Sequence, residues 1–126
     1  MTSFIITSKG NTIAYNQIIG KNTGIVFLSG YNSDMQGNKA LYIEKWAKDN
    51  NHSFLRFDYS GHGQSSGELE KTCFSDWYHD AEYIINKKTI NKQILIGSSM
   101  GAWIMLMLAK RIPNKISRII GLAPAP

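Results

Sequence analysis

Short runs of apolar residues alternate along the chain with longer segments whose apolar residues recur every three or four positions. Residues 24–28 form a continuous apolar run, which is typical of a strand buried on both faces. Residues 4–7 and 12–18 flank a Lys-Gly-Asn turn and are predicted to form a hairpin. The same pattern predicts further strands at residues 53–57, 92–96 and 117–122.

Three segments carry the apolar spacing of an amphipathic helix. Residues 38–49 have one apolar stripe, and residues 74–85 place apolar side chains at i, i+3, i+4, i+7, i+10 and i+11. We expect Thr72 to be the N-cap of this second helix, because its hydroxyl can accept a bond from the first turn. A third helix is predicted to begin at Ser99 and to end before Pro113.

Strands that alternate with helices in this order predict βαβ units. The expected fold is therefore α/β, with a mostly parallel sheet and helices on both of its faces. In such sheets ligands bind at the carboxyl ends of the strands. Three loops leave strand ends of this kind, at residues 29–37, 58–67 and 97–100, and we expect them to lie side by side.

Composition places the chain among globular proteins and removes several classes of function. Its 126 residues are 43% hydrophobic and 18% charged, as expected for one domain with a hydrophobic core. The net charge is +5, but the basic residues are scattered, so no nucleic-acid partner is expected. The single cysteine, Cys73, excludes an internal disulfide and favours a cytoplasmic location. Residues 1–11 do not resemble a secretory signal, and residues 94–109 are too short and too polar for a membrane span.

Residues 97–101, Gly-Ser-Ser-Met-Gly, carry the clearest chemical signal. A Gly-x-Ser-x-Gly pattern between a buried strand and a helix is the arrangement of a nucleophile elbow, a sharp turn that exposes a serine hydroxyl. It predicts Ser99 as the nucleophile of an acyl transfer and the backbone N–H of Met100 as one oxyanion donor. The backbone N–H of Tyr31, in the loop after the third strand, is the candidate second donor. The alternative for Ser99 is a chance match to the Gly-x-Ser-x-Gly pattern. The alternative for Tyr31 is a plain turn in which its side chain belongs to the core.

The loop at residues 58–65 also holds an acid and a histidine. Asp58 lies four residues from His62, which is a poor spacing for orienting an imidazole against a serine on another strand. We therefore interpret Asp58 and the glycines as organising a turn. His52 opens a strand away from the carboxyl edge, and His79 lies on the polar side of its helix. Neither a metal site nor a cofactor is expected from one cysteine, three dispersed histidines and the absence of a phosphate-binding loop motif.

Three segments in matching order make the chain resemble the α/β-hydrolase superfamily: residues 26–31, 56–65 and 96–101. The longer strings at residues 30–35 and 97–103 are similar to a subgroup that contains mitochondrial palmitoyl-protein thioesterases, which also cleave acyl glucuronides, and bacterial relatives.

This resemblance implies Ser99 as nucleophile and Tyr31 and Met100 as backbone oxyanion donors. It matches His62 to a loop histidine that is not the triad base. Family members are longer, with their catalytic acid and histidine on later loops. The resemblance thus implies that residues 1–126 form a partial domain, truncated after the strand that follows the elbow helix. Further strands, a lid and the loops of the triad acid and histidine are missing, which leaves an unpaired edge strand and an apolar patch.

Two functions follow as hypotheses. The first is a serine hydrolase of small-molecule carboxylic esters or thioesters that works through an acyl-enzyme on Ser99. As this chain alone it is expected to be inactive or nearly so, because a serine without its base is a poor nucleophile. The second is a non-catalytic remnant or half-domain that pairs with a complementing C-terminal polypeptide.

Overall fold

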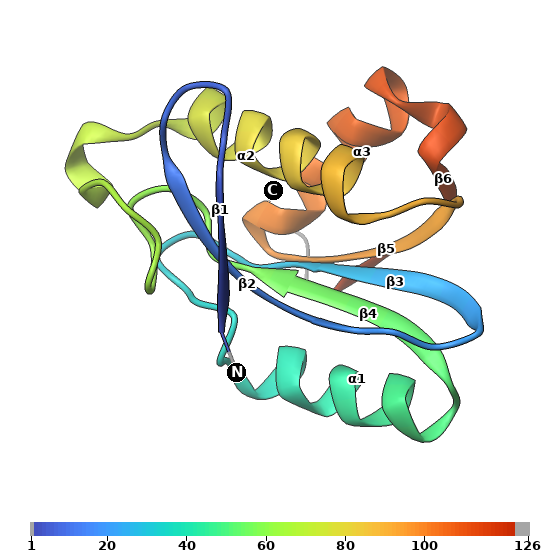
Figure 1. Ribbon diagram of the computed structural model, residues 1–126. Coiled ribbons are helices and arrows are strands. Elements are labelled where there is room, and N and C mark those ends of the chain that lie inside the picture. Colours follow the sequence, from blue (N-terminus) through green and yellow to red (C-terminus); the bar gives the residue numbers. More distant parts are fainter. Residues whose placement is uncertain (1, 123–126) are drawn as a thin grey trace.

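The computed structural model describes residues 2–122, which form three layers (Figure 1). A six-stranded sheet lies in the middle, with α2 and α3 on one face and α1 on the other. The elements in chain order are β1 (Ser3–Ile6), β2 (Thr12–Ile18), β3 (Asn22–Leu28), α1 (Asn38–Asp49), β4 (His52–Phe57), a 3-10 turn (Leu69–Lys71), α2 (Phe74–Lys88), β5 (Gln93–Ser98), α3 (Met100–Arg111), a second 3-10 turn (Pro113–Lys115) and β6 (Ile116–Leu122).

The sheet has the strand order β1-β2-β4-β3-β5-β6. The β1–β2 and β2–β4 pairs are antiparallel, whereas the β3–β4, β3–β5 and β5–β6 pairs are parallel. The predicted α/β fold with a mostly parallel sheet and helices on both faces is confirmed. The parallel pairing brings the carboxyl ends of β3, β4 and β5 to one edge, from which the three expected loops leave.

The alternation of side chains along β3 explains why residues 25–28 of this strand are all apolar. Val26 and Leu28 belong to the core under α2 and α3, while Ile25 and Phe27 belong to the core over α1. Since successive side chains of a strand point to opposite faces, a strand covered on both faces needs apolar residues at every position. These four side chains are at most 4% exposed.

The apolar stripe of α2 packs into the larger core as predicted, but the helix begins one residue later than expected. Cys73, not Thr72, is its N-cap, and the Cys73 N–H donates to the Asp76 carboxylate at 2.9 Å. The Thr72 hydroxyl instead donates to the Leu69 carbonyl at 2.9 Å and accepts from the Trp77 indole N–H at 3.1 Å. The Thr72 hydroxyl therefore connects the preceding turn to α2, and Cys73 caps the helix.

Large apolar side chains are exposed on α3 and on the neighbouring edge strand β6. Within the described residues, β6 pairs with β5 alone. Five side chains of these two elements are each between 39% and 46% exposed: Trp103, Leu106, Met107, Ile119 and Ile120. Ile119 and Ile120 are successive residues of β6 and therefore point to opposite faces of the sheet. Among residues 2–122, no helix combines the length and the apolar character needed to cross a membrane.

Candidate active site

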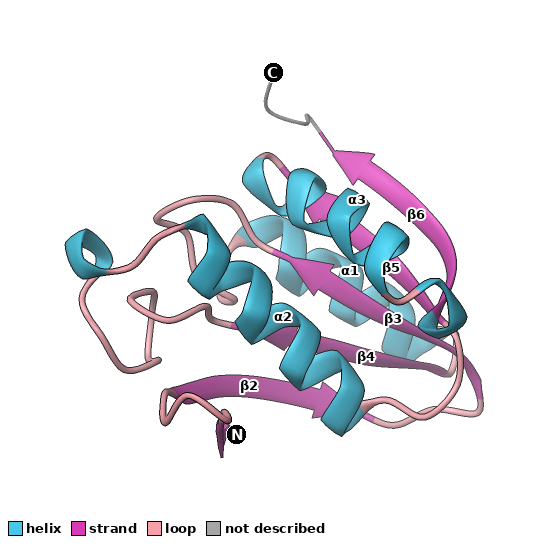
Figure 2. Cartoon of the chain, turned by 90° about the horizontal axis from the view of Figure 1, so that it is seen from above, coloured by secondary structure: helices cyan, strands magenta, loops and turns pink. Residues whose placement is uncertain are grey.

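Ser99 and the loops that follow β3 and β4 meet at the carboxyl edge of the sheet. We name residues 29–37 the β3 loop and residues 58–67 the β4 loop; both lie at the end of the sheet toward which β3 points (Figure 2). The β3 loop passes directly beside the serine, since a methyl group added at Gly30 would lie 3.3 Å from the Ser99 Cβ. A glycine at position 30 therefore lets the backbone approach the serine closely.

Ser99 has an unusual backbone conformation. Its φ is +56° and its ψ is −118°, a region that residues with a side chain rarely occupy. Backbone bonds hold it there: the Ser99 N–H donates to the Leu122 carbonyl at 3.1 Å, and its carbonyl accepts from the Ala102 N–H at 3.0 Å. The residue is exposed and directly precedes α3. The backbone therefore changes direction at Ser99 between β5 and α3, and the role of this turn as a nucleophile elbow stays a prediction.

The two glycines of the pattern are required by close packing of backbone. A Cβ at Gly97 would lie 2.5 Å from the Gly101 carbonyl oxygen. A Cβ at Gly101 would collide with the Leu28 carbonyl oxygen at the end of β3. The first turn of α3 therefore packs closely against β5 and against the start of the β3 loop. A larger residue at either glycine position would prevent this packing.

The two predicted oxyanion donors are neighbours of residues at the Ser99 turn: Met100 follows Ser99, and Tyr31 follows Gly30. Met100 is the first residue of α3, where backbone N–H groups lack helical acceptors and the helix dipole favours negative charge. Tyr31 follows Gly30 in the β3 loop, and its side chain is 57% exposed. Its ring centroid is 5.6 Å from that of Trp77. Tyr31 is thus a half-exposed loop residue and not the core residue of the alternative interpretation.

The β4 loop holds both ends of the β3 loop. The Tyr59 hydroxyl donates to the Ser29 carbonyl at 2.8 Å, and the Met35 N–H donates to the Asp58 carboxylate at 2.7 Å. The second Asp58 oxygen accepts from the Gln64 N–H at 3.0 Å. Asp58 therefore organises its own turn, as expected, and also binds the neighbouring loop, which the sequence did not predict.

His62 binds the middle of the β3 loop. Its Nε2 accepts from the Asn32 N–H at 3.0 Å, and its Nδ1 lies 3.0 Å from the Ser60 carbonyl oxygen. The ring is 3% exposed. Because both ring nitrogens are engaged by backbone groups, His62 is not free to act as a base toward Ser99. No local sequence pattern signals this contact, since the bonded residues lie 30 positions apart.

The other two histidines lie away from these loops. His52 is at the amino end of β4, where its Nδ1 is 2.7 Å from the Thr23 carbonyl and its ring stacks on Trp46. His79 is exposed on α2. Within residues 2–122, no histidine is positioned as a base for Ser99, and no group of three His, Cys, Asp or Glu side chains could hold a metal ion.

Two buried carboxyl groups support the β4 loop. Burial raises the pKa of Asp58, against the opposing effect of the N–H groups of Gln64 and Met35. Burial likewise raises the pKa of Asp80 on α2. One oxygen of Asp80 accepts from both the N–H and the hydroxyl of Ser60, at 2.7 Å and 2.6 Å. The Ser60 carbonyl contacts His62, so Asp80 connects α2 to the loops around Ser99.

Asp80→Asn is expected to remove the buried charge without losing the bonds from Ser60, because an amide oxygen can accept both. A raised pKa means that Asp80 binds its proton more tightly in the folded state than in the unfolded state. The protonated carboxyl therefore stabilises the fold at low pH, and this stabilisation is lost as pH rises from about 4. We therefore expect the variant to match or exceed the wild type in urea unfolding at pH 7, with a flatter pH dependence. Asp80→Ala, which leaves the Ser60 N–H unpaired, should cost about 1–3 kcal/mol. A loss in Asp80→Asn as large as that in Asp80→Ala would contradict this account.

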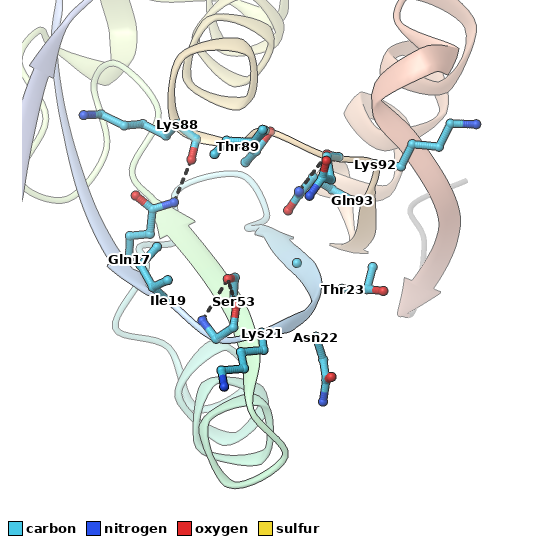
Figure 3. A pocket seen from close by; sticks show the side chains of 14 residues that line it. Gln17, Ile19, Lys21, Asn22, Thr23, Ser53, Lys88, Thr89, Lys92 and Gln93 are labelled. Atoms are coloured by element: carbon cyan, nitrogen blue, oxygen red, sulfur yellow. Dashed lines mark hydrogen bonds between the residues drawn. The ribbon is translucent and has the colours of Figure 1, made fainter.

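A cavity of about 360 Å³ opens at the opposite edge of the sheet, between the β2–β3 and α2–β5 loops (Figure 3). Its polar residues bind backbone groups; the Gln17 amide, for example, donates to the Lys88 carbonyl at 2.7 Å. The side chains of Lys88 and Lys92 extend away from it in Figure 3. A smaller cavity of about 290 Å³ is lined by Ser29, Gly30 and Ser98, and so adjoins the Ser99 turn itself.

Comparison with known proteins agrees with this geometry. The sequence model of the alpha/beta hydrolase fold family matches residues 25–126. The chain belongs to the α/β-hydrolase fold family. The rat palmitoyl-protein thioesterase ABHD10, mitochondrial, is 42% identical over 123 residues, and its human counterpart is 44% identical over 113 residues. The solved structure of the mouse alpha/beta hydrolase domain-containing protein 10 superposes with a TM-score of 0.95 at 40% identity. The chain is thus an α/β hydrolase related to mitochondrial thioesterases.

The match covers part of each relative. It includes 98% of this chain but 41% of the rat protein, and 90% of this chain but 37% of the human protein. In the mouse structure it includes 98% of this chain and 50% of the other. The chain therefore spans half or less of the length of these α/β hydrolases.

The same relatives correct the expected cytoplasmic location. The rat, bovine and mouse relatives are named as mitochondrial proteins, which contradicts that prediction. That prediction rested on the single cysteine, which argues against an oxidising compartment. A single cysteine does not distinguish one reducing compartment from another.

Proposed function

We propose that this α/β hydrolase carries the nucleophile and oxyanion part of a serine hydrolase that cleaves carboxylic esters or thioesters. The observation that carries the proposal is the Ser99 turn: an exposed serine with φ +56° between a buried strand and a helix N-terminus, with Gly30 against its Cβ. A strained residue of this kind persists only where the surrounding structure holds it, and such residues cluster at active sites.

In the proposed reaction, the Ser99 oxygen attacks the acyl carbonyl carbon while its proton passes to a general base. The N–H groups of Met100 and Tyr31 stabilise the negative charge that develops on the carbonyl oxygen. The C–O or C–S bond then breaks, and the alcohol or thiol leaves with the proton. Water hydrolyses the acyl-enzyme by the same steps and regenerates the hydroxyl. No metal or cofactor takes part in this scheme.

The general base must come from outside the described residues, because the nitrogens of His62 are engaged by backbone and the other histidines lie elsewhere. In subtilisin, loss of the catalytic histidine lowers turnover on the order of a million-fold. We therefore propose that the isolated 126-residue polypeptide is inactive or nearly so, and that residues 1–126 are one part of a larger hydrolase domain. A thioester of a long acyl chain is the proposed substrate class, because the rat and human relatives are named palmitoyl-protein thioesterases.

A fluorophosphonate probe tests the nucleophile. We expect at most weak labelling of the isolated chain, and strong labelling at Ser99 when the chain is fused to the C-terminal part of the mouse relative. Ser99→Ala should abolish the signal, whereas Ser98→Ala, which removes the neighbouring hydroxyl, should keep it. A folded fusion protein that does not react at Ser99 would contradict the proposed nucleophile. Strong labelling of the isolated chain would contradict the proposed need for a further segment.

The second candidate is a non-catalytic half-domain that pairs with another polypeptide. It is favoured by the exposed apolar side chains of α3 and β6, where Trp103 and Ile119 are 46% and 39% exposed. An exposed apolar helix next to an edge strand is a common feature of a surface that binds another polypeptide. Size-exclusion chromatography with light scattering separates the candidates: a monomer with one cooperative unfolding transition argues against an obligatory partner.

A further inference from the structure

The β4 loop contacts the β3 loop at every third residue. Ser29, Asn32 and Met35 each use one backbone group to bind the side chain of Tyr59, His62 or Asp58. The three distances lie between 2.7 Å and 3.0 Å. Tyr59 and Asp58 hold the two ends of the β3 loop, and His62 holds the middle, next to Tyr31.

The middle of the β3 loop is a turn at Asn32. Asn32 has a φ of +55°, in the left-handed region that Asn adopts more readily than most residues with a Cβ. The turn around it is closed by a long backbone bond, from the Ser33 N–H to the Gly30 carbonyl at 3.3 Å. The Asn32 N–H belongs to the peptide that joins it to Tyr31. The bond to His62 therefore fixes the orientation of the peptide next to the proposed oxyanion donor.

The backbone partners also determine which nitrogen of His62 carries the proton. Since a backbone N–H can only donate, Nε2 must be the acceptor for Asn32. Since a carbonyl can only accept, Nδ1 must carry the proton that bonds Ser60. The contacts thus require a neutral imidazole in one tautomer. A second proton would place an N–H at Nε2 against the N–H of Asn32 and break the bond.

We infer that His62 is a positioning residue that holds the β3 loop against Ser99, and that it does so only as the neutral imidazole protonated at Nδ1. The inference rests on the proposed function, because it assigns His62 to the oxyanion side of that site. Protonation of His62 breaks the bond to the Asn32 N–H. The peptide between Tyr31 and Asn32 is then no longer held in its orientation. The proposed hydrolase therefore loses oxyanion stabilisation on the acid side through His62, independently of its general base.

Three aromatic rings surround His62. The rings of Tyr31, Tyr59 and Trp77 lie nearly perpendicular to it, with centroids 6.2, 5.5 and 5.2 Å away. The ionisable groups around it are the two tyrosines, Asp58 from its own loop and Asp80, which contacts it through Ser60. Neither carboxylate is hydrogen-bonded to the ring, whose nitrogens contact Asn32 and Ser60 instead.

NMR spectroscopy of the 126-residue chain tests the inference without needing an active enzyme. We expect the imidazole nitrogens of His62 to report the Nδ1-protonated tautomer at neutral pH. On acidification, the amide signal of Asn32 should move with the same midpoint as the His62 ring. His62→Gln keeps an acceptor for Asn32 and should remove this titration, while His62→Leu should displace the Asn32 signal at every pH. His79→Gln, at an exposed histidine, is the matched control and should change none of these signals.

Two arms separate this inference from the proposed function. In a Ser99→Ala background the Asn32 titration should persist, because it needs no nucleophile. In the fusion protein that labels at Ser99, His62→Leu should slow labelling about 10- to 100-fold and His62→Gln should restore most of the rate. An Asn32 amide that ignores the protonation of His62, or equal labelling rates in the wild type and His62→Leu, would overturn the inference. Absent labelling of Ser99 with an intact Asn32 titration would overturn the proposed function instead.

Discussion

Gly101→Ala is expected to lower the free energy of unfolding by about 3 kcal/mol, at the upper end of overpacking costs. The new Cβ would collide with the Leu28 carbonyl oxygen and would lie 2.8 Å from the Ser29 carbonyl oxygen. Both are backbone atoms at the junction of β3 and the β3 loop, so no side-chain rotation relieves the overlap. Helix α3 must move away from the sheet, or the β3 loop must move away from Ser99.

The same substitution should disrupt the candidate site in molecules that remain folded. The Ser29 carbonyl is bound by Tyr59 and so helps to hold the β3 loop in place. The next residue, Gly30, packs against Ser99. Urea unfolding measures the stability, and fluorophosphonate labelling of the fusion protein measures the site. Gly37→Ala is the control, because a Cβ there would lie 3.5 Å from its nearest neighbour, an ordinary contact. Equal stability of Gly101→Ala and Gly37→Ala would show that the close approach at Gly101 is not required.

The elements were predictable because their signals are local. The run at residues 24–28 is unbroken and apolar, the stripe of α2 has a period of 3.6, and both contribute to the core as expected. The Ser99 turn was predictable for a related reason, since its glycines and its serine are neighbours in sequence. The cap of α2 was misplaced by one residue, because Thr72 and Cys73 both precede the helix and only the three-dimensional contacts of Thr72 decide between them.

The support of the site was not predictable, because it consists of contacts between distant segments. His62 and Asn32 lie 30 positions apart, and Ser60 and Asp80 lie 20 apart. In the sequence, Asp58 and His62 look like a possible catalytic pair, and their spacing argues against that role. In the structure they bind backbone N–H groups of the β3 loop. Every residue except proline has such a group, so a sequence pattern cannot indicate which one is bound.

Ser99→Gly is expected to abolish the proposed reaction and at the same time to stabilise the fold. A residue with a Cβ at φ +56° and ψ −118° carries strain of about 1–3 kcal/mol, which glycine does not have. Glycine also gains conformational entropy in the unfolded chain, which offsets about 0.5–1 kcal/mol of this. The expected net gain in the free energy of unfolding is therefore about 1 kcal/mol. Ser99→Ala loses the same hydroxyl but keeps the strain, so it should show no such gain.

The comparison of these two variants isolates the strain from the hydroxyl. Urea unfolding should rank Ser99→Gly above Ser99→Ala, while neither variant should react with the fluorophosphonate probe. Ser98→Gly is the matched control, because Ser98 belongs to β5 and its φ is not positive, so glycine there should cost about 0.5–1 kcal/mol. If Ser99→Gly proves less stable than Ser99→Ala, the turn at Ser99 is not strained. The expected ranking would mean that the chain retains, at one residue, a conformation that lowers its stability, as is common at the functional residues of active sites.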